Sequence, residues 1–139
     1  MEKAFFNNIR SEIIPLLNQA NNEVVIAMAW FTSNELFQAL LDCRKRKVKV
    51  ELIILDNAAN FMYYAPDFNV FIEEGGILKI SPLSKGFMHH KFCVIDNRIV
   101  ITGSYNWTYY AEKNIFDRFT LSFLKKNVSL HIKIYTFIP

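Results

Sequence analysis

Two short stretches rich in apolar residues, 24–31 and 48–55, constrain the fold of this chain more than any other feature. Each has the length of a β-strand and is far too short to span a bilayer. Residues 24–31 form the longest uninterrupted apolar run, which is typical of a strand covered on both faces. Strands of this kind need helices packed against the sheet, so the chain is predicted to be an α/β protein.

Amphipathic segments surround these two strands. Residues 2–20 carry apolar side chains at helical spacing and predict a first helix. Thr32 and Glu35 match the capping box that opens a helix, and they predict a second helix directly after the first strand. Pro66 and Gly75 have the residue types expected at the beginning and end of a third helix.

The whole chain, residues 1–139, has the length of a single domain. A hairpin expected over residues 91–102 adds antiparallel pairing to the helix-linked strands. We therefore expect a mixed, mostly parallel sheet with helices on both faces. The C-terminal residues 125–139 are atypical for such a fold, because residues 128–138 alternate apolar and polar side chains in the pattern of a strand. We interpret them as an edge strand, a swapped arm or a divergent tail.

The strongest functional signal is a spaced string of polar and small residues between positions 89 and 106. It reads His-x-Lys-x4-Asp-x6-Gly-Ser-x-Asn and comprises His89, Lys91, Asp96, Gly103, Ser104 and Asn106. With about 5% usage for each residue type, six fixed identities match by chance about once in 10^7 to 10^8 windows. Coincidence is therefore a poor explanation, although each residue taken alone is more often structural.

Hairpin geometry indicates how these residues come together. If Asp96 and Asn97 form a two-residue loop, His89 lies opposite Ser104 on the neighbouring strand. Side chains alternate along a strand, so Lys91 lies on the same face as His89, and the final Asn of the string shares that face if the strand continues. A three-residue loop would shift the register and scatter the groups.

The residue types suit a phosphodiester substrate. Lys91 supplies positive charge, and Ser104 and Asn106 supply directional hydrogen-bond donors to phosphoryl oxygens. His89 can act as a nucleophile, because part of an ordinary imidazole is neutral at working pH. The sequence shows no cluster of His, Cys or carboxylate residues with metal-ligand spacing, so we expect neither a metal nor a cofactor.

The string resembles the HKD motif of the phospholipase D superfamily with its accompanying Gly-Ser-x-Asn. Only one copy is present, as in short single-motif members that include bacterial endonucleases working as homodimers. The resemblance implies a metal-independent phosphodiesterase in which His89 forms a covalent phosphohistidine. It also implies that His89 of a second subunit protonates the leaving oxygen.

The resemblance assigns the other candidate catalytic residues as well. Phosphoryl oxygens would be bound by Lys91, Ser104 and Asn106. Asp96 would buttress the motif, and it also suits the hairpin turn. An acidic residue downstream usually orients the histidine in this family. The matching offset falls on Asp117, one methylene shorter than the usual Glu, and Glu112 is the competing candidate.

Composition adds weaker constraints. Lys and Arg total 16 against 13 Asp and Glu, and the resulting net charge of +3 fits a polyanionic substrate without requiring one. Residues 1–10 lack the apolar core of a signal peptide. Cys43 and Cys93 are interpreted as buried free thiols in a reducing compartment. We therefore expect a cytoplasmic protein without stable membrane association.

The sequence favours a nuclease acting on DNA or RNA, with its active site at a homodimer interface. The first alternative is a phospholipid-hydrolysing enzyme that uses the same chemistry. The second is a nucleic-acid-binding module that has lost catalysis. Two segments each allow more than one interpretation. The basic residues 44–47 either close a helix or attract phosphate. The aromatic residues 61–64 either stack on bases or cover a core edge or a dimer contact.

Overall fold

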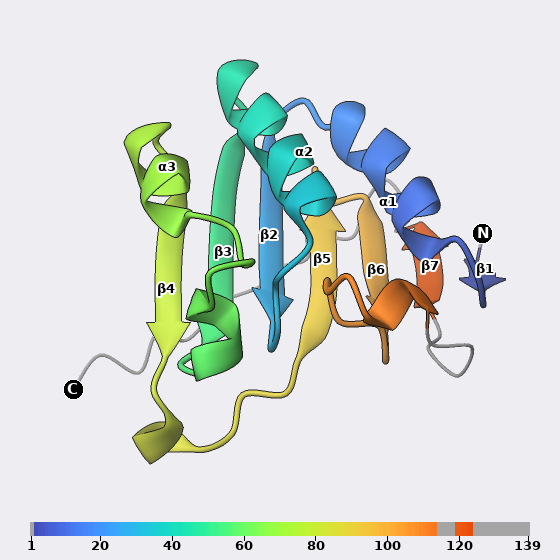
Figure 1. Ribbon diagram of the computed structural model, residues 1–139. Coiled ribbons are helices and arrows are strands. Elements are labelled where there is room, and N and C mark those ends of the chain that lie inside the picture. The colour runs from blue at the N-terminus through green and yellow to red at the C-terminus, as the bar shows by residue number, and fades with distance from the viewer. Residues whose placement is uncertain (1, 114–118, 124–139) are drawn as a thin grey trace.

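The computed structural model describes residues 2–113 and 119–123. Their strands form one seven-stranded sheet in the order β1-β7-β6-β5-β2-β3-β4 (Figure 1). The strands are β1 (Glu2–Phe5), β2 (Glu23–Met28), β3 (Lys49–Leu55), β4 (Ile77–Ser81), β5 (Lys91–Ile95), β6 (Ile99–Gly103) and β7 (Phe119–Phe123). The α-helices are α1 (Ile9–Asn18), α2 (Asn34–Lys45) and α3 (Phe68–Glu73), and the 3-10 turns are η1 (Ala58–Phe61), η2 (Leu83–Lys85) and η3 (Ala111–Lys113).

The sheet is mixed, as the sequence predicts. Strands β2, β3 and β4 are parallel, because α2 and α3 return the chain to the same edge before each new strand. The other four of the six described pairings are antiparallel. The expectation of a mostly parallel sheet is therefore wrong within the described residues, since only the crossovers through α2 and α3 join neighbouring strands, whereas β1, which α1 links to β2, pairs with β7.

All three described α-helices pack on one face of the sheet (Figure 1). Their buried side chains share one core cluster with the side chains of β2 and β3 that point to that face. The crossovers from β2 to β3 and from β3 to β4 run in the same direction, and such connections are almost always right-handed, so both place their helices on the same side. The predicted helices on the second face are not found among the described residues, and the predicted tail strand, residues 128–138, lies outside them.

The core explains why these segments fold as they do. Alternate residues of β2 and β3 point to the helices and are fully or almost fully buried; they are Val24, Ile26, Met28, Val50, Leu52 and Ile54. Against them α1 buries Ile13 and Leu17, and α2 buries Leu36 and Leu40. Each fully buried side chain of this size contributes about 1.5–3 kcal/mol to folding.

Two predicted helix boundaries are corrected. Residues 2–5 form β1 instead of the first helical turn, because they pair with β7. The helix cannot extend back beyond Asn8, whose φ of 49° is left-handed. The cap of α2 is Ser33 and not Thr32: the Ser33 hydroxyl accepts a hydrogen bond from the Leu36 amide at 3.3 Å. The Thr32 amide instead donates to the Trp107 carbonyl at 2.9 Å.

The predicted register of the hairpin is wrong by one residue. Ile95 pairs with Ile99, so the loop between β5 and β6 has three residues and not two. Asp96 and Asn97 both have a φ of 52°, and the Arg98 amide donates to the Ile95 carbonyl at 2.9 Å. This turn leaves Arg98 as an extra residue before the ladder begins, so Ser104 is not opposite His89.

The Asp96 carboxylate joins this hairpin to the beginning of β2. It accepts hydrogen bonds from three consecutive backbone amides, those of Asn21 at 2.9 Å, Asn22 at 2.8 Å and Glu23 at 3.0 Å. The Asp96 amide returns a bond to the Glu23 carbonyl at 2.8 Å. Hydrogen bonds to a charged acceptor are the stronger kind, so this cluster holds β5 in register with β2.

Both cysteines are free and buried, as the sequence predicts. Burial raises the pKa of the Cys43 thiol, although Arg46 beside it works in the opposite direction. Burial raises the pKa of the Cys93 thiol well above its usual range. Both side chains belong to the core cluster and serve packing.

Replacing Asp96 by Ala should lower the free energy of unfolding by about 2–3 kcal/mol, because three amides lose a charged acceptor. Asp96→Asn, which keeps one acceptor oxygen, should lose less. Urea denaturation followed by circular dichroism measures both values. Asp67→Ala, which removes the cap at the exposed beginning of α3, is the matched control and should cost about 1 kcal/mol. An Asp96→Ala protein as stable as this control would contradict the assignment.

Candidate active site

The motif residues other than Asp96 lie at one edge of the sheet, where β2 ends, β5 begins and β6 ends (Figure 1). The antiparallel register pairs Met28 with Lys91, and the Ala29 amide extends the ladder by donating to the His90 carbonyl at 3.0 Å. Trp30 lies two residues after Met28 and His89 lies two residues before Lys91, so the same register puts Trp30 opposite His89. Residues paired in this way point to the same face, so the two rings meet at this edge of the sheet.

The imidazole of His89 lies against two aromatic rings. Its centroid is 5.6 Å from that of Trp30, with the planes 80° apart, and 5.5 Å from that of Phe87. Trp30 and Phe87 also contact each other at 5.7 Å. The contacts restrict how the imidazole can turn, and yet His89 stays exposed to solvent. An exposed ring in a restricted orientation is what a nucleophile needs.

Lys91 brings its charge to the same place. Its Nζ donates to the backbone carbonyl of His89 at 3.0 Å and lies 5.9 Å from the centroid of the Trp30 ring. Lys91 is half-buried, whereas His89 is exposed. The ammonium therefore lies beside the imidazole and can attract an anionic group to it.

Asn106 is tied to the same strand end. Its Oδ1 accepts a hydrogen bond from the Trp30 amide at 3.4 Å, which turns the amide nitrogen away from that backbone. Ser104 is exposed directly after the last residue of β6, at the same edge of the sheet. The structure thus brings His89 and Lys91 into direct contact and links Asn106 to them through Trp30.

Asp96 does not belong to this group. It lies past the far end of β5, about 20 Å from His89 at about 3.3 Å per residue. The prediction of Asp96 as a catalytic residue is therefore corrected: it is a positioning residue that acts through the β2–β5 register. Asp117 lies outside the described residues.

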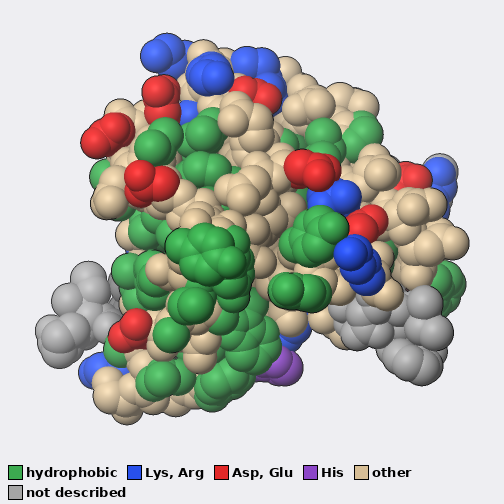
Figure 2. All heavy atoms as spheres, in the orientation of Figure 1, with side chains coloured by type: hydrophobic (Ala, Val, Ile, Leu, Met, Phe, Trp, Pro, Cys, Tyr) green, Lys and Arg blue, Asp and Glu red, His purple; other side chains and the backbone are tan. Residues whose placement is uncertain are grey.

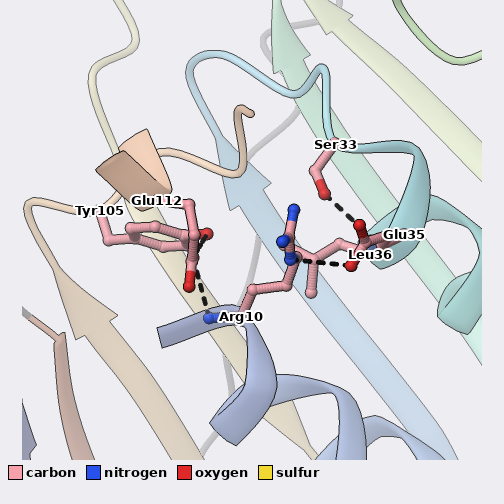
Figure 3. A network of polar contacts seen from close by, with 6 residues as sticks. All are labelled: Arg10, Ser33, Glu35, Leu36, Tyr105 and Glu112. Carbon is pink, nitrogen blue, oxygen red and sulfur yellow. Dashed lines mark hydrogen bonds and ion pairs between the residues drawn. The ribbon is translucent and has the colours of Figure 1, made fainter. Parts of the chain in front are cut away.

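Glu112, the alternative orienting acid, has other partners (Figure 3). Its Oε2 accepts hydrogen bonds from the Tyr105 hydroxyl at 2.6 Å and from the Arg10 amide at 3.1 Å. Tyr105 is almost completely buried. Glu112 therefore joins the beginning of α1 to the segment that carries Asn106.

The basic residues 44–47 lie at the opposite edge of the sheet, where α2 ends. Arg44 donates from Nε to the Glu74 carbonyl at 3.0 Å, and Arg46 donates to the Leu17 carbonyl at 3.0 Å. Lys and Arg side chains gather at that end of the molecule (Figure 2). These contacts favour the structural interpretation of the cluster over a phosphate-attracting surface beside His89.

In the part of the chain that the structure describes, no three His, Cys, Asp or Glu side chains are grouped so that they could hold a metal ion. None of the helices described there is long and apolar enough to cross a membrane.

The sequence left the aromatic neighbours of His89 partly unrecognised. Trp30 ends the first apolar run, where the sequence fits the rim of the site as well as the core, and the structure places it beside His89. Phe31 is fully buried in the core. Phe87 was missed, although it precedes His89 by two residues and alternation alone would have put the two on one face.

Comparison with known proteins identifies the family. A family model described as the phospholipase D-like domain of cardiolipin synthase matches residues 13–126. The chain therefore belongs to the phospholipase D superfamily. A relative named mitochondrial cardiolipin hydrolase, from Xenopus laevis, is 35% identical over 102 residues, which are 73% of this chain and 47% of that protein. The chain spans about half the length of the curated relatives it matches.

Two solved structures share the fold. Nuc, a phospholipase D family member from Salmonella typhimurium, superposes with a TM-score of 0.73 at 20% identity, covering 87% of this chain and 81% of Nuc. NucT from Helicobacter pylori superposes with a TM-score of 0.69 at 22% identity, covering 87% and 84%. At these identities the likeness concerns the fold, and it confirms the prediction of a phospholipase D-like α/β domain.

Replacing Trp30 by Ala should change the chemical shifts of the His89 imidazole protons more than those of His90, because the indole ring current acts on His89 alone. His90 is the internal control, since its ring lies against Phe92 at 6.2 Å. Histidine-selective NMR spectra measure both. Equal shifts of the two rings would contradict the contact between Trp30 and His89.

Proposed function

We propose that the protein is a metal-independent phosphodiesterase that acts through a covalent phosphohistidine, with nucleic acid as its substrate. The observation that carries the proposal is the exposed imidazole of His89, held between two aromatic rings with the Lys91 ammonium beside it. Membership of the phospholipase D superfamily supports the same chemistry. No step of the reaction requires a cofactor.

The reaction has two steps. A ring nitrogen of His89 attacks phosphorus, a P–N bond forms, and the P–O bond to the leaving group breaks. A second imidazole, the partner subunit's His89, gives its proton to the leaving oxygen. That imidazole then takes a proton from water as the water oxygen attacks phosphorus, which breaks the P–N bond and releases the phosphate product.

The remaining motif residues have supporting roles. Lys91, Ser104 and Asn106 would bind the phosphoryl oxygens, where negative charge builds in each transition state. Asp117 would orient His89 through its second ring nitrogen, the role that the family resemblance implies. Asp96 takes no part in the chemistry and supports it through the strand register.

Two copies of the chain would supply the two imidazoles. A two-fold axis beside His89 places a nucleophile and an acid on opposite sides of one phosphorus atom. Exposed apolar side chains along the segment leading to His89 support such an interface, since a monomer rarely leaves so many together. They are Ile80, Leu83 and Phe87, each about half exposed.

Nucleic acid is the proposed substrate, and a cytoplasmic location is proposed with it. Net charge, a single motif and the likeness to single-motif endonucleases support the substrate, and the two buried free thiols fit a reducing compartment. The names of the curated relatives point instead to cardiolipin and to mitochondria. Phospholipid hydrolysis by the same groups is therefore the second candidate function, and the exposed Leu83 and Phe87 near His89 also fit a lipid surface.

Replacing His89 by Ala should reduce hydrolysis of bis-p-nitrophenyl phosphate by about 10^4-fold or more, because the nucleophile is lost. EDTA should leave the wild-type rate unchanged. His90→Ala is the matched control, since the His90 ring lies against Phe92 and not at the site, and it should stay active. Activity that survives in His89→Ala would falsify the mechanism.

The same enzyme assay separates the substrates. Single-stranded oligonucleotides should be cleaved faster than cardiolipin in vesicles. Faster turnover of the vesicles would establish the lipid alternative. Oligonucleotide binding without cleavage of any of the three substrates would indicate a binding module that has lost catalysis.

Mixing the wild-type chain with an excess of His89→Ala chain should lower the activity per wild-type chain, because a mixed dimer lacks one of the two imidazoles. The protein should also have twice the mass of one chain in light scattering. The control is an excess of the His90→Ala chain, which should not lower the activity. An activity per wild-type chain that is independent of the added His89→Ala chain would show that each subunit works alone.

A further inference from the structure

A pocket of about 330 Å³ lies beside the site, and four of the six tyrosines of the chain line it. Tyr63 and Tyr64 come from the loop after η1, and Tyr109 and Tyr110 come from the segment before η3. Hydrophobic and aromatic side chains gather over the lower half of this face, and a His side chain shows at its lower margin (Figure 2). Loops far apart in the sequence thus meet at one aromatic surface.

The four rings are arranged as two pairs. Tyr63 and Tyr64 have centroids 5.3 Å apart, and Tyr109 and Tyr110 have centroids 5.9 Å apart. Tyr63 is 95% exposed and Tyr110 is 74% exposed, so neither ring contributes much to the core. Rings that packing does not require, placed around a pocket, are available to a ligand.

The pocket also has polar walls. Arg10 lines it and forms an ion pair from Nε to the Glu35 carboxylate at 2.9 Å (Figure 3). A guanidinium carries five N–H donors, so this pair leaves its terminal amino groups for an anion or a base edge. The Lys113 Nζ lies 4.6 Å from the centroid of the Tyr109 ring and adds positive charge at the rim.

The pocket begins just past the end of β2, the strand that leads to Trp30. Thr32 and Ser33 line the pocket, and their amides both donate to the Trp107 carbonyl at 2.9 Å. Trp30, which contacts His89, precedes Thr32 by two residues and hence by no more than about 7 Å. A polymer whose phosphodiester lies at His89 therefore passes close to the pocket.

We propose that this pocket binds the bases of a single-stranded nucleic acid on one side of the phosphodiester that reacts at His89. The inference rests on the proposed function and names its substrate class. Tyrosine rings stack on any base, which gives affinity without sequence preference. Base edges can bond to the remaining donors and acceptors of Arg10, Asn34 and Glu35, whereas an acyl chain would take the Arg10–Glu35 ion pair out of water without offering it a hydrogen bond.

The test uses the His89→Ala protein, which binds without cleaving, and a fluorescein-labelled oligothymidylate of about eight nucleotides. Adding Tyr63→Ala and Tyr110→Ala together should weaken binding about 10- to 100-fold in fluorescence anisotropy, because two stacking rings are lost. Tyr63→Phe with Tyr110→Phe keeps both rings and should restore most of the affinity. Ile72→Ala, an exposed change on α3 away from the pocket, is the control and should have no effect.

The same tyrosine changes in the protein with His89 intact should leave hydrolysis of bis-p-nitrophenyl phosphate unchanged, because that small substrate does not reach the pocket. The inference would be overturned if the Tyr63→Ala, Tyr110→Ala variant bound the oligonucleotide as tightly as its parent protein. It would also be overturned if these changes weakened binding to cardiolipin vesicles alone. Failure of the wild-type protein to hydrolyse the small substrate would refute the proposed chemistry instead. The two failures are thus distinguishable.

Discussion

Three hydrogen bonds to one carboxylate hold the arrangement on which the site depends. Asp96 accepts the amides that begin β2, and in doing so it fixes β5 alongside β2. That register determines which residues meet at the other end of the two strands. There it sets Trp30 opposite His89, and the contact between their rings follows. Asp96 therefore determines how His89 is positioned, although it lies about 20 Å from that residue.

The two edges of the sheet differ in the kind of side chain they carry. At one edge, Asp96, Arg44 and Arg46 satisfy backbone amides and carbonyls that would otherwise lack partners. At the other edge, His89 and the four tyrosines of the pocket stand partly or largely exposed. The hydrogen bonds that stabilise the domain are thus kept apart from the groups available to a substrate. This separation lets exposed side chains change with little cost to the fold.

Much of the candidate site was predictable. The spacing of His89, Lys91 and Asn106 identified the family, and the apolar runs identified β2 and β3. The register of the hairpin was not predictable, because two- and three-residue loops suit the same Asp-Asn sequence. The prediction of helices on both faces was not met within the described residues, for a related reason. A buried strand implies cover on both faces, but the direction of the crossovers, which no local pattern encodes, placed α1, α2 and α3 on one face.

The sequence by itself determined the family, the chemical groups and the order of the strands and helices that follow β1, because those follow from residue identity and local periodicity. Tertiary structure alone decided which groups meet. It removed Asp96 from the site, engaged Glu112 with Tyr105 and Arg10, and brought Tyr63 to the same pocket as Tyr110. Such contacts join residues tens of positions apart, and they depend on strand register and loop path, which short-range sequence patterns leave open.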